Sequence, residues 1–504
     1  MPSWSVADKT RLGAQWRNAN GRNGSFTGGP QHGFSQVASH GFGDPQNSYA
    51  FSMSWLEGRL YVGTSRNILQ LIKASPPKFP ASMDPWPVEV PANVFDMDLR
   101  AQIWAYDPAS GQWRQVYASP LVSRLGHAPA PRDIGYRCMA VVQGKSDRTP
   151  ALYIATAASS SRGVGAHILR YTPQSGVTVV SRPGFGNPEV TTFRTLVGFR
   201  SRLYTAPAGS GRAWNAADRP VVFESQDPGS GRWVSVSEPH FGDAANEAMY
   251  CMAVFNDHLY CGTLNSTSGF QLWRSNCAGN PPYAWERVLT DGAYRGNLNQ
   301  AVVSMCVFDS ALYIGTGISN GGYDRTRLIG PAAGEVIRLN PDDSWDLVAG
   351  TSRSTPNGFK YPISGRGPGF GNPFAGYIWS MAEHRGSLYI GTFDSTVFLL
   401  WADPKRAAES NHEHLLQQDL EKLARQRGGF DLWRSENGRQ WSCISQTGFD
   451  NLYNYGVRTM ASTPAGLFVG TANPFGPKVA VKNASGWQYY PNPRGGLEVW
   501  LGAR

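Results

Sequence analysis

The chain has 504 residues, of which 41% are hydrophobic and 12% aromatic, so it can bury a large core. Its 57 Gly and 35 Pro are spread along the whole sequence, which excludes a disordered tract and indicates a turn-rich globular protein. The net charge of +9 comes from Lys and Arg that stand singly rather than in runs, so we predict a solvated surface and no nucleic-acid partner.

No stretch approaches the roughly 18 uninterrupted apolar residues of a membrane helix, and the start MPSWSVADKTRLGAQW lacks the pattern of a secretory signal. We therefore expect no membrane partner and a cytoplasmic location. The six Cys include no CxxC pair, and two of them, Cys138 and Cys251, occupy equivalent positions of an internal repeat. Such positions favour small buried residues over disulfide partners.

The strongest internal repeat is an apolar strand that ends in Gly-Thr or a close variant. Its seven copies are LYVGT from Leu60, LYIAT from Leu152, LYTAP from Leu203, LYCGT from Leu259, LYIGT from Leu312 and Leu388, and LFVGT from Leu467. Each copy follows a strand that carries a small polar residue before Met, as in Ser52-Met53, with Thr195-Leu196 as the variant. A third strand and a fourth, usually with a Trp such as Trp113, come after it, which is the pattern of a β-meander.

Seven meanders in a row predict an all-β fold, a seven-bladed β-propeller of four-stranded antiparallel blades in a single domain. The predicted blades span residues 46–118, 132–181, 189–237, 245–290, 298–349, 374–446 and 453–504. The seventh blade lacks a fourth strand, and GAQWRNA around Trp16 resembles GQWRQVYA around Trp113. We therefore expect the N-terminal strand at residues 10–20 to complete that blade and to close the ring.

A five-residue loop recurs before the predicted inner strands. It reads GFGNP from Gly184 and Gly369, GFGDP from Gly41, HFGDA from His240 and GFDNL from Gly448. Gly permits backbone conformations that are closed to other residues, Phe can fill the space between adjacent blades, and Asn-Pro or Asp-Pro ends the turn. We interpret the loop as the junction between one blade and the next.

Large insertions after the second strands are predicted to thicken one face of the disc into a bowl that holds the functional site. They cover about residues 73–100, 208–220, 317–334, 401–429 and 472–496. The insertion in blade six carries a helix signal at residues 404–427, where Leu416, Leu420 and Leu423 form an apolar stripe. This helix is interpreted as a lid, as a contact for oligomerisation or as a decoration of the surface.

Aligning the inner strands on their small-polar–Met pairs places one residue of each blade at the mouth of the central channel. These residues are Phe51, Arg137, Arg194, Tyr250, Val303, Trp379 and Arg458. Three Arg in one ring can converge on an anion, because the guanidinium presents a fixed fork of donors. The alternative is that each Arg lies between blades and binds loop carbonyls.

Polar residues near these strands supply further candidates. Four positions before each of these channel-mouth residues, five of the seven blades carry Asn or Asp, residue types that cap tight turns. Tyr455 and Arg458 lie three residues apart, and Tyr can act as a general acid whose anion a nearby Arg stabilises. The predicted catalytic residues are Tyr455, Arg458, Asp394 and Glu247, and the predicted ligand-binding residues are Arg137, Arg194, Asp133, Asn246, Asn299, Tyr377, Trp379, Asn454 and Asn473.

The nine His form no compact metal set. His412 and His414 are two residues apart, which puts them on different sides of a helix and favours a solvated surface. The recurring Met favours packing in the gaps between blades over a copper site. We expect no metal and no cofactor.

Two turns, SQDPGSGRW from Ser225 and SENGRQW from Ser435, resemble the Asp-box turn of sialidase-like propellers, which implies a propeller blade. In length and in its Arg and Tyr candidates the chain is similar to the propeller part of cyanobacterial enzymes that join alkyl chlorides to resorcinols, although it has no glycine-aspartate calcium repeats. This second resemblance implies an alkylation in natural-product biosynthesis, with Arg and Tyr activating the leaving group.

Two functions are compatible with these patterns. The first is a metal-independent enzyme for a small-molecule substrate, a hydrolase, lyase or group transferase, with its active site in the bowl. The second is a non-catalytic propeller that binds a peptide, a glycan or an anionic ligand on the same face, with contacts such as Tyr377, Trp379 and Tyr453. Burial separates the two, because an enzyme needs a deep pocket around its Arg and Tyr, whereas a binding module exposes aromatic residues on a rim.

Overall fold

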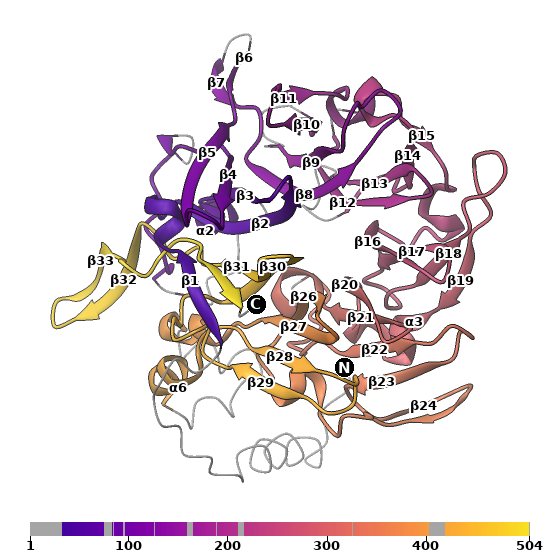
Figure 1. Cartoon of the computed structure of the whole chain (residues 1–504). Coiled ribbons are helices and arrows are strands. Elements are labelled where there is room, and N and C mark those ends of the chain that lie inside the picture. The colour runs from indigo at the N-terminus through magenta and orange to yellow at the C-terminus, as the bar shows by residue number, and fades with distance from the viewer. Residues whose placement is uncertain are drawn as a thin grey trace.

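The computed structural model describes residues 33–74, 83, 85–93, 96–124, 127–158, 165–187, 189–209, 216–324, 326–402 and 419–502. Most strands belong to one antiparallel system, and Figure 1 shows their groups arranged around a common centre. The fold is therefore propeller-like. Within the ranges given above, no helix has the length and the apolar character needed to cross a membrane.

Each group begins with a hairpin of two long strands. The first strands are β2 (Asn47–Leu56), β8 (Gly135–Val142), β12 (Thr192–Phe199), β16 (Ala248–Phe255), β20 (Ala301–Phe308), β26 (Tyr377–His384) and β30 (Gly456–Thr463). The second strands are β3 (Arg59–Arg66), β9 (Ala151–Ala157), β13 (Arg202–Ala208), β17 (His258–Leu264), β21 (Ala311–Gly317), β27 (Ser387–Phe393) and β31 (Gly466–Ala472). The second strands carry the Gly-Thr repeat, and their side chains are almost all buried.

Shorter strands complete each group on its outer side. The third strands are β4 (Gln102–Asp107), β10 (Ile168–Thr172), β14 (Phe223–Ser225), β18 (Leu272–Ser275), β22 (Val336–Leu339), β28 (Leu432–Ser435) and β34 (Val499–Gly502). The fourth strands are β5 (Gln112–Ala118), β11 (Gly176–Val179), β15 (Val234–Ser235), β19 (Glu286–Leu289), β23 (Trp345–Ala349), β29 (Ser442–Ser445) and β1 (Phe34–Ala38). Each group is thus an antiparallel meander, as the repeat predicts.

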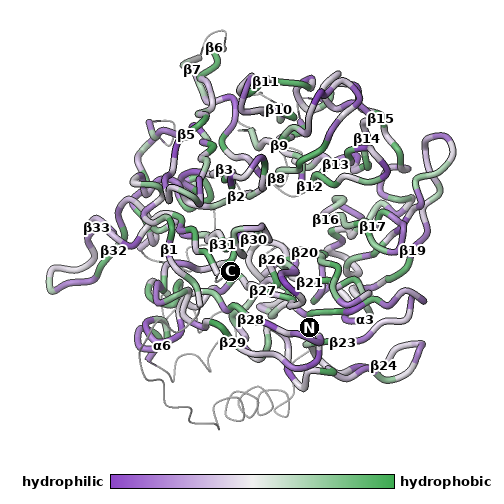
Figure 2. Tube along the Cα trace, viewed as in Figure 1, coloured by the Kyte–Doolittle hydropathy of each residue, from purple (hydrophilic) through white to green (hydrophobic). Residues whose placement is uncertain are grey.

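The first strands contact one another in sequence order. β2 contacts β8, and the contacts continue through β12, β16, β20 and β26 to β30, which contacts β2 again. The hairpins of first and second strands carry many hydrophobic residues, whereas the outer loops are mostly hydrophilic (Figure 2). Packing of each hairpin between two neighbours explains why both of its faces are apolar.

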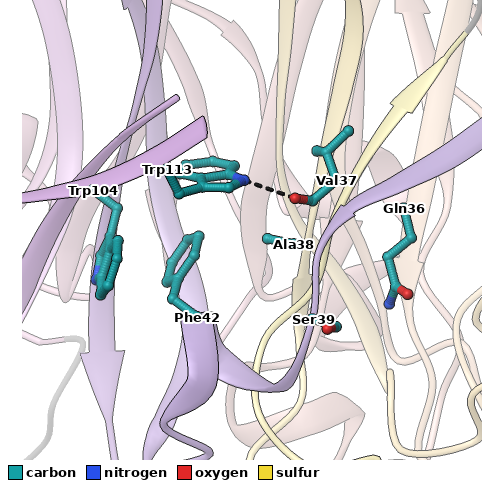
Figure 3. Close-up of a pocket in the computed structure, with 7 residues that line it drawn as sticks. All are labelled: Gln36, Val37, Ala38, Ser39, Phe42, Trp104 and Trp113. Atoms are coloured by element: carbon teal, nitrogen blue, oxygen red, sulfur yellow. Dashed lines mark hydrogen bonds between the residues drawn. The ribbon is translucent and has the colours of Figure 1, made fainter. Parts of the chain in front are cut away.

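The fourth strand of the last group comes from the start of the described chain. β1 pairs antiparallel with β34, so that Phe34 lies opposite Gly502 and Ala38 opposite Val499. β1 also contacts the first group, where Trp113 of β5 donates its Nε1–H to the Val37 oxygen of β1 at 2.7 Å. This hydrogen bond lies beside a cavity of about 340 Å³ (Figure 3).

The sequence predicted this closing strand at residues 10–20, which lie outside the described residues. The strand that pairs with β34 is Phe34–Ala38, and it has no Trp. Its aromatic residue is Phe34, whose ring centroid lies 5.3 Å from that of Phe449. The Trp pattern of the other fourth strands therefore pointed to a different segment.

Additional hairpins and short helices lie in the connections. The hairpins pair β6 (Leu121–Arg124) with β7 (His127–Pro131), β24 (Arg353–Thr355) with β25 (Gly358–Lys360), and β32 (Lys478–Asn483) with β33 (Gly486–Pro491). The α-helices are α2 (Ile68–Ala74), α3 (Asp291–Tyr294), α4 (Ser319–Gly322) and α6 (Leu420–Arg427), and the 3₁₀ turns are η1 (His40–Gly43), η4 (Pro183–Gly186), η5 (Pro228–Ser230), η6 (Pro239–Gly242), η7 (Gly296–Leu298), η8 (Pro368–Gly371) and η9 (Thr396–Trp401).

The helix predicted at residues 404–427 is present from Leu420 to Arg427 as α6. Asp419 caps it, since its carboxylate accepts a hydrogen bond from the Lys422 N–H at 3.0 Å. Leu423 is half-buried and Ala424 is buried where α6 packs against η9. Residues 404–418 of the predicted helix, with Leu416, lie outside the described part of the chain.

The recurring Gly-Phe loop is a tight turn with two successive residues in the left-handed region. In η1 the φ angles of Gly41 and Phe42 are both 61°, and the turns η4, η6 and η8 repeat this geometry. The ring of Phe42 stacks on Trp104 at 4.7 Å and packs against Trp113 at 4.7 Å. The Phe therefore packs on the outer strands of the group that it precedes, which corrects the expectation that it fills the space between adjacent blades.

Gly448 shows why the first position of this loop is usually Gly. Its φ is +61°, and a Cβ there would lie 2.6 Å from the Asn451 oxygen and 2.8 Å from the Asn454 oxygen. Gly386, with φ +73° and no atom within 4 Å of a Cβ, provides a control for the backbone effect alone. We expect Gly386→Ala to cost about 1 kcal/mol of unfolding free energy and Gly448→Ala about 3 kcal/mol, as measured by urea unfolding. Equal costs would contradict the close approach.

Candidate functional site

Each first strand contains a β-bulge at the residue that precedes the small-polar–Met pair. The register shifts between Ala50 and Ser52 in β2, and at the matching place in every other first strand. A bulge leaves a residue outside the ladder and re-aims its side chain. The bulged positions are Phe51, Arg137, Arg194, Tyr250, Val303, Trp379 and Arg458, termed the bulge ring below. They are the residues that the sequence alignment placed at the centre.

Side chains of the bulge ring contact one another across neighbouring strands. The guanidinium carbon of Arg458 lies 4.5 Å from the ring centroid of Phe51 and 5.4 Å from that of Trp379. Arg137 lies 5.5 Å from the same Phe51 ring, and Arg194 lies 3.3 Å from Tyr250. Cations and aromatic faces therefore alternate around part of the bulge ring, as cation–π pairs do.

The three guanidinium groups are close enough to perturb one another. Burial lowers the pKa of Arg137 well below its usual range, and the charges of Arg194 and Arg458 lower it further. Burial is also the main cause that lowers the pKa of Arg458, with Arg194 contributing. Because Arg stays protonated in proteins, this crowding is an excess of positive charge that a bound anion would stabilise.

The alternative role for the Arg side chains is also partly realised. Arg194 donates its Nε–H to the Tyr250 carbonyl of the next first strand at 3.3 Å. Cys138 likewise donates its thiol to the Arg194 carbonyl at 2.9 Å, and Ser52 donates to the Tyr136 carbonyl at 2.6 Å. Ser52 and Cys138, the small polar residues beside two of the bulges, thus tie neighbouring groups together. All three Arg side chains remain half-buried rather than fully enclosed.

Tyr455 lies in an aromatic cluster next to Arg458. Its hydroxyl is hydrogen-bonded to the hydroxyl of Tyr49, and both side chains are buried. Its ring centroid lies 4.9 Å from Phe393 and 6.1 Å from Trp379. Burial raises the pKa of Tyr49 to about 12 and that of Tyr455 well above its usual value, while the charge of Arg458 lowers both. Both hydroxyls are therefore protonated at neutral pH, and they suit proton donation better than nucleophilic attack.

Insertions from three groups meet beside this cluster. Trp401 of η9 donates its Nε1–H to the Ala480 oxygen of β32 at 2.9 Å, and Gln70 of α2 donates to the Gly476 oxygen at 2.9 Å. Phe475 packs against Tyr455 at 5.7 Å. These insertions therefore shield the Tyr455 side of the centre from solvent.

Four Asn of the turn position make the same pair of hydrogen bonds, which assigns them to the scaffold. Each side-chain amide donates to a carbonyl of the preceding loop at 2.9–3.0 Å and to a Gln or Glu at the start of the third strand at 2.6–3.0 Å. The residues are Asn47, Asn246, Asn299 and Asn454. Because both amide N–H groups are used and the side chains are fully buried, the ligand-binding role predicted for the last three gains no support.

Other predicted site residues also lie within the scaffold. Asp133 is buried and pairs with Arg132 at 2.8 Å, and Asn473 donates to the Asn454 side chain at 3.1 Å. Glu247 is half-buried, accepts a hydrogen bond from Ser266 and lies 3.7 Å from an Arg327 nitrogen. None of these contacts involves a residue of the bulge ring. Tyr377 does adjoin it, with its ring 5.9 Å from Trp379 and its hydroxyl accepting the Gly321 N–H at 2.5 Å.

Asp394 belongs to a buried carboxylate pair rather than to the centre. Asn372 donates the same amide nitrogen to Asp394 at 2.6 Å and to Asp431 at 3.2 Å. Burial raises the pKa of Asp394 to about 6, and burial together with the neighbouring Asp394 raises that of Asp431 to about 8. Asn372 compensates for Ala375, which stands where four other groups carry the scaffold Asn.

This pair predicts a pH dependence of stability. Because both pKa values are raised above the unfolded value of about 3.9, the folded state holds protons that the unfolded state has lost, and stability should fall as pH rises from about 4 to about 8. Asp431→Asn keeps the acceptor without the charge, so we expect a weaker pH dependence and at least about 1 kcal/mol more stability at pH 8. Thermal unfolding between pH 5 and pH 8 measures this, with the exposed Asp309→Asn as control. Parallel curves for the variant and the wild type would refute it.

One aromatic residue of the centre escaped the sequence prediction of the site. Tyr49 adjoins the bulge ring, and its hydroxyl is hydrogen-bonded to that of Tyr455. Alternate residues of a strand share a face, so the spacing of Tyr49 before Phe51 and of Tyr377 before Trp379 was a usable signal.

No protein-family model matches the chain, and no curated protein matches it. Among solved structures it is similar to an ancestral GH74 enzyme, at 11% identity and a TM-score of 0.46 over 90% of this chain and 48% of that chain. It is also similar to a puromycin-hydrolysing peptidase of Mycobacterium tuberculosis, at 9% identity and a TM-score of 0.46 over 93% of this chain and 57% of that chain. A GH74 xyloglucanase from Xanthomonas campestris gives 13% identity and a TM-score of 0.41 over 94% and 56% of the two chains.

The chain spans about half the length of these structures. The likeness concerns the propeller-like fold. The family comparison gives no support to the resemblance to alkylating enzymes.

Proposed function

We propose that the protein is a seven-bladed propeller, closed by β1, that binds a small anionic molecule at the bulge ring. The observation that supports this function is the meeting of Arg137, Arg194 and Arg458, which come from three separate first strands. Like charges repel, so a fold that collects them at its centre gains most from a ligand of opposite charge.

Arg suits this task better than Lys would. Its planar fork reaches two oxygens of a carboxylate, phosphate or sulfate at once. Phe51 and Trp379 hold the Arg458 guanidinium between their faces, which limits its rotamers and reduces the entropy lost on binding. Binding of this kind needs no metal.

Calorimetric titration of the wild-type protein with phosphate, sulfate and acetate tests the proposal, in a buffer of low ionic strength because charge attraction is screened by salt. We expect saturable binding that weakens as salt is added, and weaker binding to Arg458→Lys, which keeps the charge but loses the fork. Failure of every anion to bind, at any salt concentration, would overturn the proposal.

Catalysis is the second candidate function, and the Tyr49–Tyr455 hydroxyl pair beside Arg458 favours it. A protonated hydroxyl next to a bound anion can donate a hydrogen bond or a proton to a leaving group. In this version the protein is a metal-independent hydrolase, lyase or group transferase, and Tyr455 is its proton donor.

Tyr455→Phe removes one hydroxyl and keeps the ring that packs on Phe393. If catalysis occurs, we expect turnover to fall about 100-fold while anion affinity changes little. Steady-state kinetics on a substrate found by screening would measure this, with Tyr453→Phe as the control from the same segment. Unchanged turnover would leave anion binding without catalysis.

A further inference from the structure

The bulge ring is asymmetric, with aromatic residues on one arc and cations extending beyond it. Trp379, Arg458 and Phe51 occupy consecutive first strands, β26, β30 and β2. Arg137 and Arg194 follow on β8 and β12. A ligand at the centre therefore meets flat apolar faces on one side and guanidinium groups on the adjoining side.

The aromatic arc continues outward into a larger apolar cluster. Tyr49 meets Trp379 edge to face at 5.8 Å and 87°, and Trp379 meets Phe393 at 5.4 Å and 84°. Phe51 and Tyr455 belong to the same cluster, together with residues of α2, η9 and β32. Trp379 itself is only half-buried, so part of its ring remains accessible beside the charged groups.

From this arrangement we infer that the ligand is an anion joined to a planar apolar body, such as an aromatic carboxylate, with its charge toward Arg137, Arg194 and Arg458 and its flat body against the half-buried Trp379. The inference rests on the proposed anion site and specifies its ligand class. An inorganic anion would leave the accessible part of the Trp379 ring unused, and an uncharged sugar would gain nothing from the three positive charges. Two of the Arg side chains already lie against aromatic faces, so a flat ligand can join that stack.

The test compares benzoate with acetate, and both with uncharged benzyl alcohol, by calorimetric titration of the full chain. We expect benzoate to bind at least about 10-fold more tightly than acetate, and benzyl alcohol to bind at least about 10-fold more weakly than benzoate. Equal affinities for benzoate and acetate would overturn this inference and leave the anion site standing. If benzyl alcohol matched benzoate, or if neither anion bound, the proposed function itself would fail.

Trp379→Phe narrows the flat face and tests the residue assignment. We expect it to weaken benzoate binding several-fold and to leave acetate binding unchanged. Trp487→Phe, on the exposed hairpin β32–β33, is the matched control and should change neither affinity. Because Trp379 packs on Gly456, a thermal melt must first show that the variant folds. If it does not fold, quenching of the wild-type Trp fluorescence by benzoate, but not by acetate, gives the same information, and identical quenching by both would refute the assignment.

Discussion

Removal of residues 1–38 is expected to lower the free energy of unfolding by about 4 kcal/mol or more relative to a chain that lacks only residues 1–32. The difference between the two truncations contains β1, whose Phe34, Ser35, Gln36 and Ala38 pair with β34. Each lost ladder hydrogen bond costs about 1 kcal/mol. Loss of apolar burial adds roughly another 1–3 kcal/mol.

The packing of β1 explains why the loss should be large. Ala38 is buried in a cluster with Val499 and Phe468, and Phe34 lies against the backbone of Gly502. Without β1 the edge of β34 is open, and an open edge invites pairing with a second chain. Urea unfolding of both truncations, with light scattering to detect association, measures the effect. Equal midpoints would show that β1 does not hold the last group in place.

The second large effect is expected from the double substitution Arg137→Met/Arg458→Met, which should weaken anion binding about 1000-fold. Charge-assisted hydrogen bonds contribute roughly 1.5–3 kcal/mol each, and the variant removes those of two guanidinium groups. Met keeps an apolar stem of similar length against the Phe51 ring that both Arg contact. Affinity should therefore fall without collapse of the centre.

The same variant should be more stable than the wild type in the absence of ligand, because burial and mutual repulsion lower the pKa of both Arg in the folded state. We expect a gain of about 1 kcal/mol in urea unfolding. Arg114→Met, on the exposed surface of β5, is the control and should change neither quantity. A variant that loses stability and keeps its affinity would show that the Arg side chains serve the scaffold instead.

The meander pattern was predictable because it depends on local chemistry that every repeat shares. Strand periodicity, Gly-Thr ends and turn residues recur, and the strands formed where they recur. The closing strand was harder to place, because β1 is held by pairing with β34 and by contacts with residues far away in the sequence, such as Phe449 and Trp113, which leave no local sequence signature. Contacts between residues that are more than 400 positions apart cannot be read from a local pattern.

In the candidate site too, features that depend on the local repeat could be predicted, and features that depend on distant partners could not. The bulge ring was found by alignment alone, since one bulge recurs at one place in every first strand. The roles of Asn246 and Asp394 were not predicted, because they depend on partners elsewhere in the chain, Gln271 and Asn372. Whether an amide or a carboxylate is already occupied is a property of the packed structure.

The bulges also give this protein a particular freedom to change. A residue outside the ladder contributes no pairing of its own, so its identity is uncoupled from the sheet that carries it. Arg, Tyr, Trp, Phe and Val all occupy this one position in different groups without altering the strand around it. Selection can therefore change the side chain at a bulge without changing the strand that carries it, and the seven positions together offer many recognition surfaces on an unchanged frame.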